Sequence, residues 1–333
     1  MKKVIITVDT ESHIGSNPVE RLIMGKLDNG VCAGIPLIMD ICEQHGTKGL
    51  FFVDFAEAWD YGEESIKRVV DCILDRGHDI GMHIHPDHIA DKRKLFLSDY
   101  SYNEQYEIIN RCTDLYEKMV GRNPLAFRAG KYGANRETLD ILTKLDYKAD
   151  FSEFYGYEKW CHILPPVTGN ESVEIRNGLL EFPVMSYKSE VKGVINRYDK
   201  LDINESPITH KYLLKKYGTM EEVNVISLFL HSFSFLHWKQ NPENPKINKS
   251  AIKTMHQAMK QITYSTEMEF ADLNTLLQGQ YRSEDEINPS VLTLPPMDAL
   301  ALYIIKSLRV LRTRLNVMRG KKSMGISGKK VNI

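Results

Sequence analysis

The sequence predicts an α/β protein built on a mostly parallel sheet, and two features of its 333 residues support this. Short runs rich in β-branched and aromatic residues alternate with longer stretches whose apolar residues recur every three or four positions. Several of these longer stretches end at a glycine, which is a common helix stop. Seven or eight strand candidates, in a chain long enough for an α/β barrel of roughly 200 to 400 residues, favour a barrel over an open sheet.

The expected elements follow one another in strand–helix order. The first strand, KVIITVD, is almost continuously apolar, which is typical of a buried strand. The middle segment, 155–225, is less regular and is expected to contribute a β-hairpin or loops over a site. The expected strands cover 3–9, 48–54, 78–85, 125–130, 147–152, 179–186, 225–235 and 268–273, and the expected helices cover 35–46, 64–77, 103–120, 135–145 and 249–263.

The formal net charge of −1 conceals an uneven distribution of charge. Residues 299–333 contain nine Lys or Arg and no acidic residue, so the rest of the chain holds 34 basic against 44 acidic side chains. An acidic body repels polyanions, which argues against nucleic acid as a partner. The five cysteines are scattered singly without a CxxC pair, which is typical of reduced thiols in a cytosolic protein.

Targeting signals are not evident in the sequence. The N-terminal apolar run has only four residues before Asp9, whereas a secretory signal needs about 7 to 15. No stretch reaches the roughly 18 apolar residues of a membrane span. We therefore expect a cytoplasmic protein.

Three segments are expected along the chain: a catalytic domain over 1–281, a linker over 282–296, and a C-terminal segment over 297–333. Apolar residues recur every three or four positions in the last segment, with Lys and Arg between them, which indicates a basic amphipathic helix followed by a disordered tail. This helix could pack against the body, lie on an anionic membrane surface through residues 297–322, or pair with another copy of the chain.

Polar side chains gather where four of the expected strands end, although the strands themselves are apolar. Loops that follow the strands of a parallel sheet face a common opening, so these side chains are expected to lie together. The residues at these ends are Asp9 and Glu11, then His83, His85 and His88, then Arg128, and finally His231.

The histidine-rich stretch predicts a metal site. His83 and His85 are two positions apart, so in an extended chain their side chains project to the same face. A carboxylate from the first strand would complete a set of two histidines and one carboxylate, which suits a divalent cation with open positions. His88 follows Pro86 in the next loop, so the third ligand stays open between His85 and His88.

Three further strand-end residues suit hydrolytic chemistry. Asp9 is the candidate base for a metal-activated water, and a contact with Arg128 would hold it in place and ionised. His231 could donate a proton to a leaving amine or alcohol. The structural alternatives are a buried Asp9–Arg128 ion pair and a histidine satisfied within the core.

In order and spacing, these motifs resemble those of the NodB-type polysaccharide deacetylases, carbohydrate esterase family 4, over about residues 3–275. The likeness rests on TVDTES, GHDIGMH, FRAGKYG, YKADFSEF and LFLHSFS. It implies that Asp9 is the base, that Arg128 steadies this base, and that His231 is the general acid. It also implies that the metal ligands are Glu11 or Thr10, then His83, and then His85 or His88. Asp150 would belong to the fourth motif of the family.

The resemblance also implies a fold and a reaction. The fold would be a NodB-like distorted (β/α)7-type barrel, here followed by a C-terminal amphipathic helix. The reaction would be hydrolysis of an N-acyl group, usually acetyl, from an amino sugar of a polysaccharide or lipid-linked glycan. It would use a divalent metal, most often zinc, with cobalt or manganese as alternatives.

Departures from the usual motifs leave two other functions open: O-ester or cyclic-amide hydrolysis on the same fold, and a non-catalytic glycan-binding or scaffold relative at the membrane. Tyr132 and Trp238 are expected to contact the sugar, with Asp54 and Trp160 as further candidates, because aromatic faces suit sugar rings. The oligomeric state stays open.

Overall fold

The computed structural model describes residues 1–333 except 14–16, 176–177, 240 and 309–333. The chain divides into two units. The larger unit comprises Met1–Tyr187 and Tyr198–Leu292, and the smaller unit comprises Lys188–Arg197 and the residues from Thr293 onwards.

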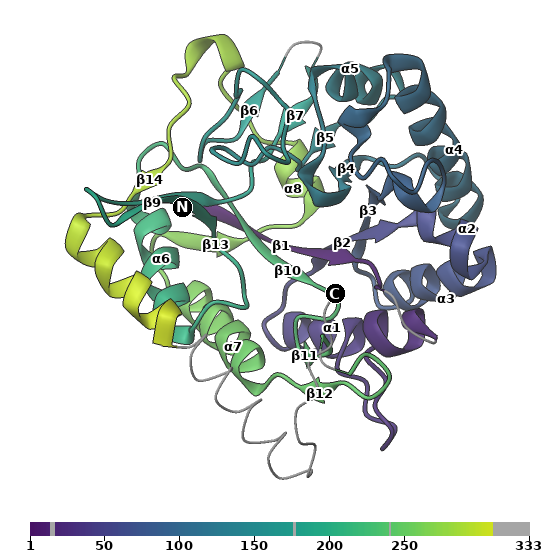
Figure 1. The fold of residues 1–333 in the computed structure, drawn as a ribbon, viewed down its shortest axis with the longest axis horizontal. Coiled ribbons are helices and arrows are strands. Elements are labelled where there is room, and N and C mark those ends of the chain that lie inside the picture. Colours follow the sequence, from purple (N-terminus) through teal and green to yellow (C-terminus); the bar gives the residue numbers. More distant parts are fainter. Residues whose placement is uncertain (14–16, 176–177, 240, 309–333) are drawn as a thin grey trace, which may run out of the picture. The chain divides into compact units, whose positions relative to one another are not determined.

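One nine-stranded sheet forms the centre of the larger unit (Figure 1). Its order is β10–β1–β2–β3–β4–β5–β7–β6, with β13 also paired to β1, and every pair except β6–β7 is parallel. The expected barrel is not closed: the sheet is a curled half-barrel whose first and last strands, β10 and β6, are not paired in the described part of the chain. The strands are β1 (Lys2–Thr10), β2 (Gly49–Asp54), β3 (Asp79–Ile84), β4 (Ala126–Ala129), β5 (Ala149–Asp150), β6 (Val173–Glu174), β7 (Leu180–Glu181), β10 (Val225–His231) and β13 (Met268–Phe270).

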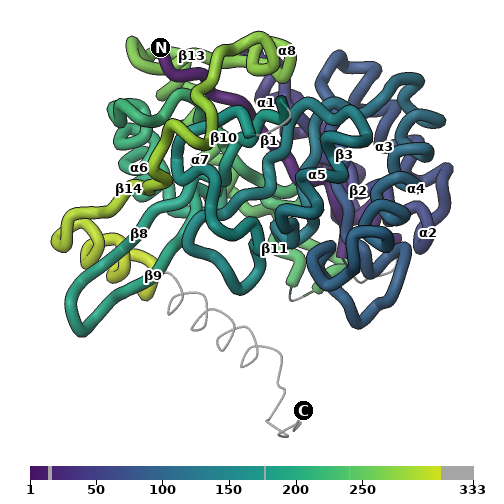
Figure 2. Tube along the Cα trace, turned by 90° about the horizontal axis from the view of Figure 1, so that it is seen from above, coloured from purple at the N-terminus to yellow at the C-terminus, as the bar shows by residue number. Residues whose placement is uncertain are grey.

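Helices surround this sheet, with α3 and α4 packed against β3 and α7 packed against β13 and α6. Figure 2 shows the unit from above, with the purple β1 beside β10. The helices are α1 (Ile35–Gln44), α2 (Ala58–Tyr61), α3 (Glu63–Leu74), α4 (Tyr102–Val120), α5 (Arg136–Lys144), α6 (Pro207–Thr219), α7 (Lys249–Thr263) and α8 (Leu273–Leu277). Short helical turns cover Val19–Ile23, Phe55–Glu57, Pro86–His88, Leu97–Asp99, Gly130–Tyr132 and Glu284–Glu286.

Local sequence explains the ends of the main helices. Ser101 precedes α4 and forms a capping box with Glu104, and Gly121 ends the helix in the left-handed region with φ of 81°. Asn135 begins α5 by accepting a hydrogen bond from the Thr138 amide at 2.9 Å.

The expected strands and helices are all present, but α6 was missed. The buried face of α6 carries Thr209 and His210 beside Leu213, Leu214 and Tyr217, so no purely apolar stripe marks it in the sequence. The hairpin expected within 155–225 is present as β8 (Ser186–Val191) and β9 (Ile195–Lys200).

The smaller unit contains most of that hairpin, part of β14 (Leu292–Thr293), and a helix over residues 296–308. Ala299 and Leu302 of this helix are buried, whereas Met297, Ile304 and Leu308 are exposed. The rest of the expected amphipathic helix and the expected tail lie outside the described residues. Among the described helices, none has the length and apolar content that crossing a membrane requires.

The first part of the expected linker packs within the larger unit. The Leu292 amide donates to Asn170 Oδ1 at 2.7 Å, and the Asn170 amide donates to the Ser290 carbonyl at 2.9 Å. Arg136 also forms an ion pair with Glu284 at 2.9 Å. Residues 282–292 are therefore held by specific polar contacts, and the domain division at 281 stays a prediction.

A buried carboxyl group supports the loop after β5. Glu153 is 1% exposed and accepts hydrogen bonds from the amides of Val167 at 3.0 Å and Thr168 at 3.1 Å. Burial raises the pKa of Glu153 to about 7, although these amides partly offset the effect. The folded state therefore favours the protonated form of Glu153 at mildly acidic pH.

We expect this carboxyl group to make the protein less stable as the pH rises. Because the pKa of Glu153 is higher in the folded than in the unfolded chain, its stabilisation is complete below about pH 4.5 and is lost as the pH passes about 7. The free energy of unfolding of Glu153→Gln, relative to the unmodified protein, should increase by about 2.5 kcal/mol between pH 5 and pH 8. Urea unfolding at both pH values measures this, with the exposed Glu137→Gln as control. A difference that does not change with pH would contradict it.

Candidate active site

The register of the parallel strands brings the polar strand ends to one edge of the sheet. Asp9 pairs with His231 across β1 and β10, while Asp54 pairs with His83 across β2 and β3. His83 in turn pairs with Arg128 of β4. Because all these strands run in the same direction, their carboxyl ends open on the same side.

Asp9 and Arg128 form a buried ion pair. Arg128 Nη1 donates to Asp9 Oδ1 at 2.6 Å, and both side chains are nearly inaccessible to solvent. Burial would raise the pKa of Asp9, but Arg128, with His83 and His231, more than offsets it and holds this pKa below its usual value. Asp9 is therefore a carboxylate at neutral pH.

The other donors of Arg128 are also used, so its orientation is determined. Nη2 donates to Thr7 Oγ1 at 3.0 Å, and Nε donates to the Phe151 carbonyl at 3.1 Å. The guanidinium lies 4.4 Å from the ring centre of Phe52, which adds a cation–π contact.

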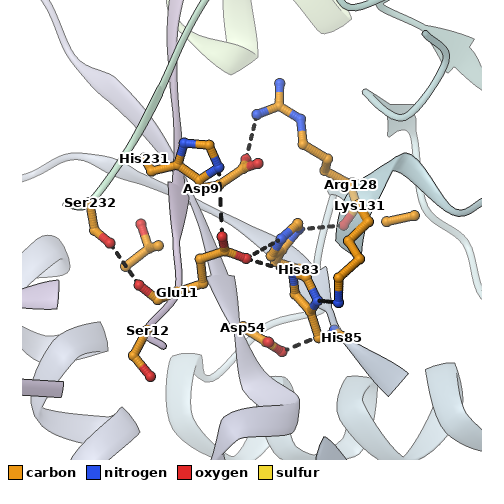
Figure 3. Close-up of polar contacts among 12 residues, drawn as sticks. Asp9, Glu11, Ser12, Asp54, His83, His85, Arg128, Lys131, His231 and Ser232 are labelled. Atoms are coloured by element: carbon orange, nitrogen blue, oxygen red, sulfur yellow. Dashed lines mark hydrogen bonds and ion pairs between the residues drawn. The ribbon is translucent and has the colours of Figure 1, made fainter. Parts of the chain in front are cut away.

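Glu11, His83 and His85 form a second cluster, which we call the Glu11 group (Figure 3). One nitrogen or oxygen from each lies within 4.8 Å of the others. Glu11 Oε2 is 3.3 Å from His83 Nε2 and 2.5 Å from His85 Nε2, and Glu11 Oε1 is 3.6 Å from His231 Nε2. Figure 3 shows Glu11 between these three rings, with Arg128 joined to Asp9.

The Glu11 group fits a divalent cation. His83 Nδ1 lies 2.7 Å from the Arg128 carbonyl, so it carries a proton there and leaves Nε2 as the ligand atom in the neutral ring. His85 Nε2 is buried and lies directly against Glu11 Oε2. An imidazole nitrogen and a carboxylate oxygen that converge in this way suit two ligands of one ion.

Electrostatics also favours a positive charge in this group. Burial lowers the pKa of His83, but Asp9 and Glu11 overcome this effect and raise the pKa to about 9. Burial raises the pKa of Glu11, but the neighbouring histidines, His85 first, hold it well below its usual value. A bound cation would take the place of the proton on His83.

His231 ends β10 beside Asp9 and is partly exposed. Its ring stacks on Phe233 with a centroid distance of 4.8 Å. Burial lowers the pKa of His231, with Glu11 opposing the effect. The neutral form is therefore favoured at neutral pH, and a proton on this ring must be supported by nearby negative charge.

The structure separates His88 and Asp150 from the Glu11 group. His88 Nδ1 binds Asp60 Oδ2 at 2.7 Å, and His88 falls in a different cluster with Asp54 and Glu57. Asp150 accepts a hydrogen bond from Ser152 Oγ at 2.6 Å, and that hydroxyl also accepts from the Ala129 amide at 2.9 Å. Asp150 therefore contacts the strand that carries Arg128 through Ser152.

The two aromatic residues expected at the sugar site lie in different surroundings. Tyr132 is buried, and its hydroxyl accepts a hydrogen bond from Lys200 Nζ at 2.5 Å. Trp238 stacks on His13 with a centroid distance of 4.5 Å and meets the edge of Phe233.

Lys200 and Lys131 are two site residues that sequence reasoning missed. Lys200 Nζ lies 3.4 Å from the centre of the Phe229 ring, and burial lowers the pKa of Lys200. Lys131 Nζ is 3.3 Å from His85 Nδ1. No sequence pattern pointed to Lys200, because it lies in the irregular segment 155–225. Lys131 directly follows the FRAG motif, so its position next to that motif was the available sequence signal.

The turn after β4 is unusually tight beside His85. Lys131 and Tyr132 both adopt positive φ, of 53° and 59°, which is uncommon for residues other than glycine. At Gly130, a Cβ atom would lie 2.7 Å from His85 Cγ. Only glycine fits there without moving the His85 ring.

The ion pair between Asp9 and Arg128 should affect the free energy of unfolding, which can be measured without an activity assay. Arg128→Met leaves the Asp9 charge buried and unpaired, so the free energy of unfolding should fall by about 3–5 kcal/mol. Adding Asp9→Asn to Arg128→Met removes that charge and should restore more than about 1 kcal/mol. Denaturant unfolding of both single variants and the double variant measures the coupling, and strictly additive effects would contradict it.

Comparison with known proteins supports this fold and relates part of the sequence to one family. Residues 15–149 match the polysaccharide deacetylase family, a segment that includes His83, His85 and Arg128. The comparison with curated proteins found no match.

Two solved structures show the fold. A protein from Mycobacterium smegmatis, provisionally named a polysaccharide deacetylase, is similar with a TM-score of 0.55 and 17% identity, over 88% of this chain and 95% of that chain. The 4-alpha-glucanotransferase from Thermococcus litoralis is similar with a TM-score of 0.52 and 12% identity, over 88% of this chain and 41% of that chain. The family match thus covers residues 15–149 of this chain, and the two solved structures, at such low identity, show the fold alone.

Proposed function

We propose that the protein is a metal-dependent hydrolase that removes an N-acyl group, most simply acetyl, from an amino sugar of a polysaccharide or lipid-linked glycan. The observation that carries this proposal is the position of Asp9. Its carboxylate is held ionised by Arg128, His231 lies beside it on the neighbouring strand, and the Glu11 group lies at the same edge of the sheet. The match of residues 15–149 to the polysaccharide deacetylase family supports the same reaction class.

The proposed roles follow from the surroundings of each side chain. A divalent cation held by Glu11, His83 and His85 would polarise the acyl carbonyl and lower the pKa of the attacking water. Asp9 accepts the proton of that water, because Arg128 keeps it ionised. His231, beside Glu11, would donate a proton to the leaving amine from its protonated form, which burial disfavours and the Glu11 carboxylate partly restores.

We propose zinc as the ion, because two imidazoles and one carboxylate with open positions suit zinc chemistry, and cobalt or manganese would fit the same donors. Tyr132 and Trp238 are proposed to line the sugar site. Asp150 is proposed to position Arg128 without contacting it. Asp150 orients the Ser152 hydroxyl, which in turn accepts a hydrogen bond from Ala129 in the strand of Arg128.

We propose that the enzyme works in the cytoplasm on a glycan precursor and that its C-terminal helix contacts an anionic membrane surface. Supporting this, Met297, Ile304 and Leu308 are exposed, and Lys and Arg accumulate from residue 306 on.

Two substitutions separate metal binding from proton transfer. His83→Ala should remove both bound zinc and release of acetate from an N-acetylated sugar. Asp9→Asn retains a hydrogen-bond acceptor for Arg128 but loses the base, so it should keep zinc and lose at least about 100-fold in turnover. Metal analysis by mass spectrometry with an acetate assay measures both, and Asp140→Asn on the surface is the control. Asp9→Asn with full activity would contradict the mechanism.

Membrane contact is testable in the complete chain. Ile304→Gln combined with Leu308→Gln should lower recovery with anionic vesicles in a flotation assay, because it removes two exposed apolar side chains. Neutral phosphatidylcholine vesicles are the control for charge. Equal recovery of both proteins with anionic vesicles would end this part of the proposal.

A further inference from the structure

A second cluster of possible metal ligands lies next to the Glu11 group. Asp54 ends β2, Glu57 lies in the turn Phe55–Glu57 that follows, and His88 lies in the turn Pro86–His88 after β3. One ligand atom from each lies within 4.8 Å of the others. We call these three residues the Asp54 group.

Each carboxylate of this group is held by one oxygen and presents the other without a partner. Asp54 Oδ1 accepts from the Ala56 amide at 3.0 Å, whereas Asp54 Oδ2 has no hydrogen bond. Glu57 Oε1 accepts from Ser12 Oγ at 2.8 Å and from the Ser12 amide, whereas Glu57 Oε2 has none. Both side chains are fully buried.

Among the described residues, histidine is the only basic side chain that lies within ion-pair distance of these two carboxylates. Within the described part of the chain, neither Asp54 nor Glu57 forms an ion pair with a lysine or arginine, and His88 Nε2 is 3.9 Å from Asp54 Oδ2. A fully buried carboxylate is costly unless it is paired, protonated or bound to a cation. The two unpartnered oxygens therefore mark a place that favours positive charge.

His88 is oriented to supply the third ligand. Its Nδ1 lies 2.7 Å from Asp60 Oδ2, so the neutral ring donates Nδ1–H to Asp60 and keeps a lone pair on Nε2. A histidine held by an outer carboxylate in this way is the usual arrangement around protein-bound metals. The 3.9 Å between Nε2 and Asp54 Oδ2 is too long for a hydrogen bond, and it exceeds by about 0.5 Å the spacing of two tetrahedral ligands that each lie about 2.1 Å from one ion, so a small approach of the His88 ring would complete the site.

We propose that Asp54, Glu57 and His88 form a second divalent-cation site, separate from the Glu11 group. Two carboxylate oxygens and one imidazole suit manganese or zinc. The two groups are neighbours, because the His85 amide approaches Asp54 Oδ1 at 3.4 Å and the His85 and His88 rings are 6.4 Å apart. A second ion would therefore add positive charge beside the first, whatever reaction the first supports.

Manganese binding to the complete chain tests this proposal. The protein is stripped with a chelator and titrated with Mn²⁺ by calorimetry, and bound manganese per chain is measured after gel filtration. The unmodified protein should bind two equivalents, whereas Glu57→Gln, whose amide oxygen can still accept from Ser12, should bind one. His83→Gln should also bind one, and the two substitutions together should abolish binding. The exposed Glu64→Gln is the matched control and should bind two.

Three outcomes would overturn the second site. The first is a single equivalent in the unmodified protein that Glu57→Gln leaves unchanged. The second is one equivalent that both Glu57→Gln and His83→Gln remove, which would mean one ion shared by the two groups. The third is two equivalents retained in Glu57→Gln. Circular dichroism checks folding, and His88→Gln replaces Glu57→Gln if that variant does not fold. Because stoichiometry is read without turnover, failure here is distinct from failure of the proposed hydrolase.

Discussion

The buried contact between Arg128 and Asp9 is the constraint on which the candidate site depends. These residues belong to β4 and β1, which are separated in the sheet by β2 and β3. Neighbouring strands lie about 4.8 Å apart, so a flat sheet would hold β1 and β4 roughly 14 Å apart. A distance of 2.6 Å between Arg128 Nη1 and Asp9 Oδ1 therefore requires the curled sheet and a long side chain that crosses its inside.

Such a pair is poorly explained by stability alone. The free-energy cost of removing two charges from water is about as large as the attraction between them, so apolar residues of similar volume often stabilise a protein equally well. Here the arginine does more than pair with Asp9, because its own carbonyl receives the Nδ1 proton of His83. One residue thus orients the candidate base with its side chain and a candidate metal ligand with its backbone.

The fold itself does not determine the reaction. A 4-alpha-glucanotransferase has a similar fold at 12% identity. Chemistry depends instead on the side chains placed at the carboxyl ends of the strands. In this chain those ends carry two adjacent clusters, the Glu11 group and the Asp54 group, which share the edge formed by β1, β2 and β3. Acidic and imidazole side chains at such density favour cations over anions at this edge.

By itself, the sequence determined the alternation of strands and helices and the polar residues at the ends of its parallel strands. Both follow from local periodicity and from strand direction, which put Asp9, His83, Arg128 and His231 on one edge. Only the tertiary structure grouped His85 with Glu11 and His83 and placed His88 near Asp54 and Glu57, because the turn Pro86–His88 sets where each ring points. It also decided the partners of Asp54 and Glu57 and the place of Lys200, since these depend on segments far apart in the chain that no local pattern relates.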